Sequence, residues 1–98
     1  MYRIDEKSKG AELKKVDFFY TAPAGSHVSL AGSFNDWDPE ADMMTFSAES
    51  GTFTCSLMLP QGSYEYKMVV DGNWMLDESN PNFTANDFGT LNSVLTVN

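Results

Sequence analysis

Short runs in which apolar and polar residues alternate fill most of this chain, and they restrict it to an all-β fold. In the clearest run, residues 52–59, the side chains of Phe53, Cys55 and Leu57 share one face of a strand. Turn-forming residues interrupt the runs about every ten residues. No long stretch has the 3.6-residue period of an amphipathic helix.

The alternating runs and the turns between them predict an antiparallel sheet structure with short connections. Strands are expected at residues 13–21, 27–32, 44–46, 52–59, 63–70, 73–76 and 93–97. Asp71 and Gly72 indicate a tight hairpin, whereas residues 33–42 and 77–90 have the composition of loops. The sequence therefore predicts an all-β fold, an antiparallel β-sandwich of seven or eight strands.

Length and composition indicate a single domain preceded by a short arm. The chain has 98 residues, and residues 1–12 are polar and mixed in charge, so we expect a flexible arm followed by one domain at 13–98.

The first residues contain no apolar core of a secretory signal, which favours a cytoplasmic protein. No apolar run approaches the roughly 20 residues of a membrane helix. The lone Cys55 excludes an intrachain disulfide.

The charge balance limits the partners. Fourteen acidic residues oppose six basic ones, for a formal charge of −8. Five of the basic residues lie before residue 16, which leaves Lys67 isolated in an acidic body. Such a surface repels phosphate backbones and favours neither a nucleic acid nor a membrane as partner. It does not oppose a neutral ligand, and the high aromatic content of 13% suits one.

The acidic residues between 33 and 42 resemble a calcium loop only in composition. An EF-hand loop requires Gly at its sixth position and Glu at its twelfth. Counted from Asp36, these positions hold Ala41 and Ser47. We therefore interpret the segment as a solvated acidic loop, and the sequence predicts no metal and no other cofactor.

The residue types that commonly act in catalysis, namely His, Cys, Asp and Glu, form no nucleophile or acid–base motif in this sequence. His27, the only histidine, stands at a strand start, where a surface position is expected. Cys55 shares a face with Phe53 and Leu57, so we expect it to be a small buried hydrophobic residue. The acidic residues lie in loops and on polar strand faces. The sequence therefore predicts a protein that is not an enzyme.

Two tryptophans occupy positions that are unusual for core residues. Trp37 lies in the acidic loop, and Trp74 follows the predicted hairpin turn. Either ring could fold inward as a lid on the core. Lys67, however, alternates with Tyr66 and Met68 and should leave the core face. Flat rings near a cation and amides suit a neutral polyol, because the rings stack on sugar C–H faces while polar groups bind hydroxyls.

Three segments together resemble carbohydrate-binding module family 48. They are Val-Ser-Leu-Ala-Gly-Ser-Phe-Asn-Asp-Trp at 28–37, Gly-Ser-Tyr-Glu-Tyr-Lys-Met-Val-Val-Asp-Gly-Asn-Trp at 62–74 and Phe-Gly-Thr-Leu-Asn-Ser-Val-Leu at 88–95. The family includes the glycogen-binding domain of the AMP-activated protein kinase beta subunit and the N-terminal domains of branching and debranching enzymes. The resemblance covers residues 13–98, and the joint spacing of the motifs makes it specific.

The resemblance implies an immunoglobulin-like β-sandwich. It also implies non-catalytic binding of an α-1,4-glucan such as glycogen, starch or a maltooligosaccharide. It implies the following site residues: Trp37, Lys67, Trp74, Phe88, Thr90 and Asn92. Two tryptophans of the family stack on successive glucose units, and Trp37 and Trp74 match them. Lys67 matches a lysine that binds hydroxyls. Phe88 matches an apolar wedge that is more often leucine.

A second interpretation of the same residues stays open. Exposed tryptophans are also the anchors of protein interfaces. The chain could then be a structural or protein-interaction domain that packs against a glycan-processing enzyme of glycoside hydrolase family 13 or against a kinase-type partner. On this hypothesis the faces of Trp37 and Trp74 are buried in the interface rather than stacked on a sugar.

Overall fold

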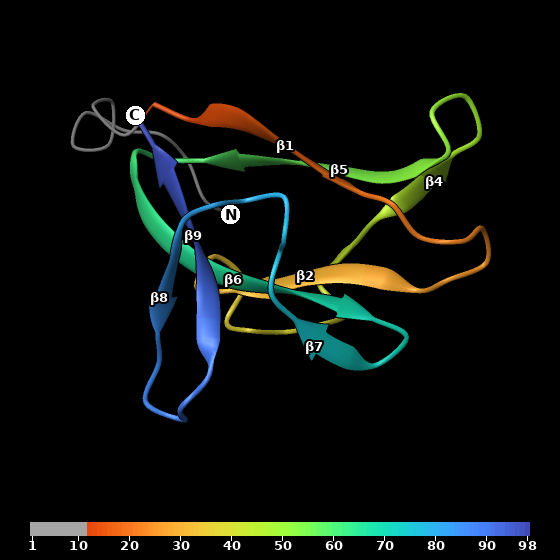
Figure 1. The fold of residues 1–98 in the computed structure, drawn as a ribbon. Coiled ribbons are helices and arrows are strands. Elements are labelled where there is room, and N and C mark those ends of the chain that lie inside the picture. The colour runs from red at the N-terminus through yellow and green to blue at the C-terminus, as the bar shows by residue number, and fades with distance from the viewer. Residues whose placement is uncertain (1–11) are drawn as a thin grey trace.

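A computed structural model describes residues 12–98, and every regular element in this range is a strand (Figure 1). The predicted arm at 1–12 lies, apart from its last residue, outside the described residues. The strands are β1 (Lys14–Tyr20), β2 (Val28–Gly32), β3 (Asp42–Met43), β4 (Thr45–Ser47), β5 (Thr52–Leu59), β6 (Gly62–Val70), β7 (Asn73–Met75), β8 (Phe83–Ala85) and β9 (Leu91–Val97). The described range contains no helix that could cross a membrane.

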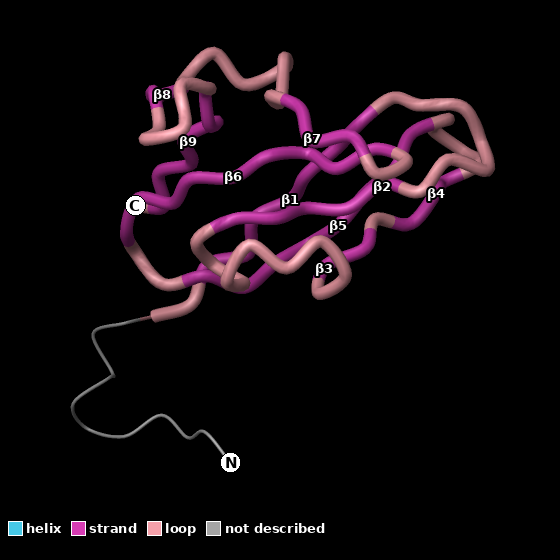
Figure 2. Tube along the Cα trace, turned by 90° about the horizontal axis from the view of Figure 1, so that it is seen from below, coloured by secondary structure: helices cyan, strands magenta, loops and turns pink. Residues whose placement is uncertain are grey.

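The strands form two antiparallel sheets that lie face to face, as Figures 1 and 2 show from two directions. The small sheet has the order β1-β5-β4, and the large sheet has the order β3-β2-β6-β9-β8, with β7 also paired to β6. The predicted all-β sandwich is thus confirmed. Figure 1 also shows that the β8–β9 hairpin extends away from the small sheet.

Strand β6 is the centre of the large sheet. One of its edges pairs with β2, where Leu30 lies opposite Met68. The other edge pairs first with β9 and then with β7, where Val69 lies opposite Trp74. Strands β9 and β7 therefore follow one another along the same edge of β6, and this brings residues near 74 and near 92 to one region of the sheet.

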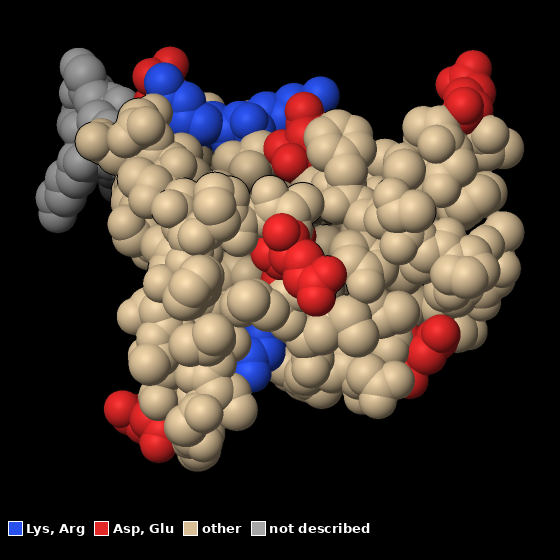
Figure 3. Space-filling model, in the orientation of Figure 1, with Lys and Arg blue, Asp and Glu red and all other residues tan. Residues whose placement is uncertain are grey.

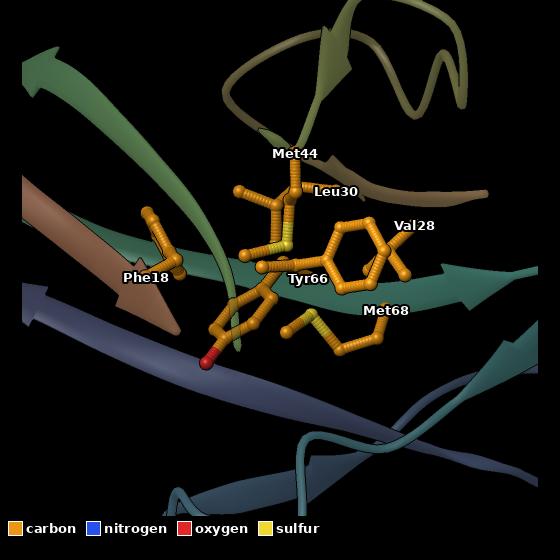
Figure 4. Close-up of a cluster of buried hydrophobic side chains, with 7 residues drawn as sticks. Phe18, Val28, Leu30, Met44, Tyr66 and Met68 are labelled. Carbon is orange, nitrogen blue, oxygen red and sulfur yellow. The ribbon is translucent and has the colours of Figure 1, made fainter. Parts of the chain in front are cut away.

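The core lies between the two sheets, and Figure 4 shows most of its side chains. Its buried members are Phe18, Val28, Leu30, Met44, Phe53, Tyr66 and Met68. The rings of Phe18 and Tyr66 pack edge to face with centroids 5.4 Å apart, which joins the small sheet to the large one. On β6, Tyr66 and Met68 point into this core as their parity predicts, and Val69, which points to the other face, is also buried.

Two features of the strand order differ from the prediction. The expected strand at 44–46 is in fact two strands, because the chain passes from the large sheet to the small one at buried Met44. The predicted loop at 77–90 contains strand β8. Both differences involve strands of two or three residues, which are too short to produce a recognisable alternation.

The lone cysteine and the lone histidine take the faces that the sequence predicts. Cys55 points inward and packs against the core but is only half-buried. Burial raises the pKa of its thiol, and the charge of Asp42 raises it further. His27 is exposed at the start of β2, where its backbone N–H donates to Asp71 Oδ1 over 2.8 Å.

Candidate functional site

The loop between β2 and β3 presents Trp37, and its first residues explain why Gly-x-Phe-Asn-x-Trp is a structural unit. A Cβ atom on Gly32 would lie 2.5 Å from the carbonyl oxygen of Glu65, so only glycine fits there. Phe34 lies near Tyr64 and Tyr66, with ring centroids 6.3 Å from each. The phenylalanine anchors the loop to the core on one side, and Trp37 leaves it on the other.

Asn35 ties this loop to itself. Its Oδ1 accepts from the backbone N–H of Gly32, and its Nδ2 donates to the Leu30 carbonyl and to Asp42 Oδ2. Trp37 then adopts a φ of 59°, in the left-handed region that bulky residues rarely occupy. A conformation of this kind persists only where its surroundings enforce it, which is typical of functional positions.

The β6–β7 hairpin positions Lys67 and Trp74. Asp71 and Gly72 both have positive φ, 50° and 83°, as the predicted two-residue turn requires. The turn pairs Trp74 with Val69, which places the indole on the outer face of the large sheet. Lys67 leaves the same face, opposite in direction to Tyr66 and Met68. The indole of Trp74 is 46% exposed, so it does not form a core lid.

The loop between β8 and β9 is organised by Asn86. Its Oδ1 accepts from the backbone N–H groups of Phe88 and Thr90, at 2.9 and 3.1 Å. Its Nδ2 donates to Thr90 Oγ1 at 2.7 Å and to Asn92 Oδ1 at 3.2 Å. These bonds hold the loop in a tight turn and leave the ring of Phe88 90% exposed at its tip.

The three segments enclose one pocket of about 560 Å³ on the outer face of the large sheet. Its lining is Trp37, Lys67, Trp74, Asn86, Asp87, Phe88, Thr90 and Asn92. All six residues expected from the resemblance thus lie together. Asn86 and Asp87 were missed, although Asn-Asp two residues before a glycine is a turn signal that could have marked them.

The pocket combines aromatic walls with a hydrogen-bonded floor. Lys67 Nζ donates to Thr90 Oγ1 over 2.9 Å, and Asn92 Nδ2 donates to Glu65 Oε1 over 2.9 Å. Among residues 12–98, Lys67 lies apart from the other lysines, Lys14 and Lys15, which begin β1 of the small sheet, and Figure 3 shows the basic side chains in two separate places. Within the same residues, no group of three or more His, Cys, Asp or Glu side chains could hold a metal ion.

A buried polar cluster lies beneath this pocket, on the inner face of the same strands. The Tyr66 hydroxyl donates to Asp77 Oδ2 over 2.6 Å, and the Asp77 backbone N–H donates to Ser93 Oγ over 3.0 Å. Burial raises the pKa of the Tyr66 phenol well above its usual value, and the bond to Asp77 adds to this. The cluster joins the strands that carry Lys67 and Asn92 to the segment that follows Trp74.

Comparison with known proteins identifies the family of the chain. A model of the glycogen recognition site of AMP-activated protein kinase matches residues 15–98. The chain belongs to this family. The match covers the whole sandwich and all three pocket segments, so the resemblance of the motifs to a glycogen-binding module is confirmed at the level of the family.

Curated relatives of this glycogen-recognition family include plant and animal proteins. The chain is 41% identical over 96 residues to the rice protein FLOURY ENDOSPERM 6, chloroplastic, and 36% identical over 86 residues to Arabidopsis thaliana Protein PTST homolog 2, chloroplastic. It is 34% identical over 94 residues to the rat 5'-AMP-activated protein kinase subunit beta-1. These matches cover 97%, 88% and 96% of the chain but only 17%, 16% and 32% of the relatives.

Proposed function

We propose that this chain binds an α-1,4-glucan, such as glycogen, starch or a maltooligosaccharide, without catalysing a reaction on it. Membership of the glycogen-recognition family supports carbohydrate binding. In the proposed complex the indoles of Trp37 and Trp74 stack on neighbouring glucose units. Lys67 and Thr90 donate to sugar oxygens, and Asn92 completes the polar floor. The ring of Phe88 contacts the oligosaccharide from the side.

One observation carries the proposal: two indoles, an exposed phenyl ring and Lys67 line one pocket of a protein whose formal charge is −8. Glucose units offer apolar C–H faces and a rim of hydroxyl groups, which match aromatic walls and a polar floor. The indole of Trp74 and the ring of Phe88 are already exposed, so they reach a ligand without unfolding any part of the core. A charged ligand is not required, since Lys67 already bonds a neutral hydroxyl.

The expected affinity is modest. By analogy with base stacking, each indole contributes about 1–3 kcal/mol. Each net hydrogen bond from the floor adds about 1 kcal/mol. Association costs several kcal/mol, so the expected dissociation constant for a short oligosaccharide is about 10 μM to 1 mM. A polymer that presents many sites raises the apparent affinity without new contacts.

A protein-interaction role is the second candidate, and the outer face of the small sheet favours it. Phe19 and Met58 are 59% and 55% exposed there. One relative is a kinase subunit, of which this chain matches about a third. A chain that docks onto an enzyme through this face keeps the glucan pocket free.

The cytoplasmic location stays a prediction, because two relatives are named as chloroplastic.

Isothermal titration with maltoheptaose, with cellohexaose as control, tests the proposed function. Binding of the α-linked sugar alone is the expected result, because the curvature of an α-1,4 chain brings successive rings to the two indoles. Equal binding of both sugars would contradict the proposed linkage preference. Absence of binding to either sugar would leave the protein-interaction role as the better account of the exposed aromatics.

A further inference from the structure

The hydrogen bonds under the pocket can be followed atom by atom, starting at Glu65. Its carboxylate has no proton to donate when ionised, so it accepts, and the atom of Asn92 that faces it must be the amide nitrogen. Asn92 Oδ1 is thereby turned toward Asn86, whose Nδ2 donates to it. Glu65 therefore fixes the orientation of the Asn92 amide, which is only 5% exposed.

Asn86 has the orientation that Asn92 Oδ1 requires, and two further bonds within its own loop support it. Two backbone N–H groups, those of Phe88 and Thr90, require its oxygen on their side. Its two N–H protons then point to Asn92 Oδ1 and to Thr90 Oγ1. A primary amide has two donors and two lone pairs, so Asn86 has no capacity left for a ligand.

Thr90 is the last residue in this series of hydrogen bonds. Its hydroxyl accepts from Asn86 Nδ2 and also from Lys67 Nζ. A hydroxyl has two lone pairs and one proton, and both lone pairs are engaged. Thr90 therefore has only its proton to offer, and the side chain is exposed toward the pocket. Lys67 keeps further N–H protons but no acceptor.

We propose that Glu65 is a positioning residue. It keeps Asn92 Oδ1 turned toward Asn86 Nδ2 and so stabilises the arrangement in which the Thr90 hydroxyl accepts from Asn86 and Lys67 and has only its proton to offer a ligand. Thr90 and Lys67 then only donate to a ligand, so they select ligand oxygens with free lone pairs, whereas the carboxylate of Asp87, which also lines the pocket, accepts. Asn92 holds the network through one N–H and one lone pair, and its amide keeps a second N–H and a second lone pair. This inference rests on the proposed function for its ligand but not for its geometry.

Two substitutions of similar length separate the accepting oxygen of Glu65 from its bulk. Glu65→Gln retains an oxygen that Asn92 Nδ2 can bond, whereas Glu65→Met does not. We expect Glu65→Gln to bind maltoheptaose within about twofold of the wild type and Glu65→Met about tenfold more weakly. Both variants should melt within about 5 °C of the wild type, since the residue is only half-buried. Equal affinity of the two variants would overturn the proposal.

A double-substitution experiment tests whether Glu65 acts through Thr90. Thr90→Val removes the hydroxyl at nearly constant shape and should weaken maltoheptaose binding by about fivefold to tenfold. In that background, Glu65→Met should weaken binding no further, because the group that it positions is gone. Multiplication of the two losses would show that Glu65 acts by another route and would overturn the proposal.

A sugar-free measurement separates this inference from the proposed function. In ¹⁵N–¹H spectra of the unliganded protein, the side-chain amide signals of Asn92 should shift strongly in Glu65→Met and much less in Glu65→Gln. Unchanged signals in Glu65→Met would overturn the positioning role whatever the ligand is. If the spectra change as expected but the wild-type protein binds no maltoheptaose, the proposed function is contradicted and the positioning role of Glu65 is not.

Discussion

Strand β6 carries a hydrogen-bond network on each face, and the two networks end differently. On the inner face, the Tyr66 hydroxyl donates to Asp77 and accepts from Asn80 Nδ2. On the outer face, Lys67 uses one bond to Thr90 and keeps free N–H protons. Among residues 12–98, no buried side-chain nitrogen or oxygen lacks a hydrogen-bond partner.

The difference separates stability from binding along a single strand. The inner network is saturated by the protein, so its removal leaves buried groups without partners and destabilises the fold. The outer network leaves donors toward the pocket, so its removal should weaken ligand binding at little cost in stability. Alternation makes this possible, because neighbouring residues of one strand point to opposite faces.

The largest expected effect is on the inner face. Asp77 is 6% exposed and accepts from Tyr66, from the Ser79 backbone N–H and from Ser79 Oγ. Asp77→Ala leaves the buried Tyr66 hydroxyl without its acceptor, whereas the exposed Ser79 can bond to water, and the loss of the buried charged bond should lower the free energy of unfolding by about 3 kcal/mol. Urea denaturation measures this change. The exposed neighbour supplies the control, since Glu78→Ala should change stability by less than about 0.5 kcal/mol. Similar effects of both substitutions would refute a special role for the cluster.

Trp74→Ala should show the opposite pattern on the outer face. Loss of the half-exposed indole should weaken maltoheptaose binding by about 2 kcal/mol, or roughly thirtyfold, with little change in melting temperature. Titration and thermal melting of the same sample check both statements. Trp74→Phe is the matched control, because a smaller ring retains part of the stacking. A large fall in melting temperature would instead place Trp74 among the core residues.

Tyr66→Phe tests the inner network through its dependence on pH. The variant should be about 1.5 kcal/mol less stable at neutral pH, because the hydroxyl bonds to Asp77 and Asn80 are lost. Folding raises the pKa of this phenol above its usual value of about 10, so above that pH the unfolded chain loses the proton first. The stability of the wild type should therefore fall toward that of the variant as the pH rises through about 10.

Melting curves of both proteins between about pH 8 and pH 11 measure this convergence. The other titrating groups are common to the two proteins, so their contributions cancel in the difference. Parallel curves over the whole range would show that the pKa of Tyr66 is not raised by folding.

The sequence predicted those parts of the fold and the site that depend on short-range patterns. Alternation placed Lys67 opposite to Tyr66 and Met68, and the Asp71-Gly72 turn places Trp74 on the same outer face. The sheet pairing then needs no further information to bring these two residues together. The full set of six expected residues came from the resemblance to the family, and these residues line one pocket in the structure.

The parts that the sequence did not predict depend on contacts between distant segments. Asp77 lies in a segment that has the composition of a loop. Its burial depends on Tyr66 and Ser93, which belong to two different strands. Asn86 looks like an ordinary turn residue until β8 pairs with β9 and brings Asn92 next to it. Met44 gives no local sign that the chain changes sheets there.

Lys67→Met has the smallest expected effect on maltoheptaose affinity, and the salt dependence of that effect shows whether Lys67 acts through a hydrogen bond or through its charge. The substitution keeps an unbranched side chain of similar length but removes the ammonium group. It should weaken maltoheptaose binding by about 1 kcal/mol, or roughly fivefold. Because the sugar is uncharged, this loss should be nearly the same in about 0.05 M and about 0.5 M salt, whereas attraction between opposite charges is screened by salt. Lys67→Arg retains the charge but not the compact ammonium that bonds Thr90 Oγ1, so it should recover little of the lost affinity. A steep salt dependence, or full recovery with arginine, would mean that Lys67 acts through its charge, and the pocket would then suit an acidic partner better than a neutral glucan.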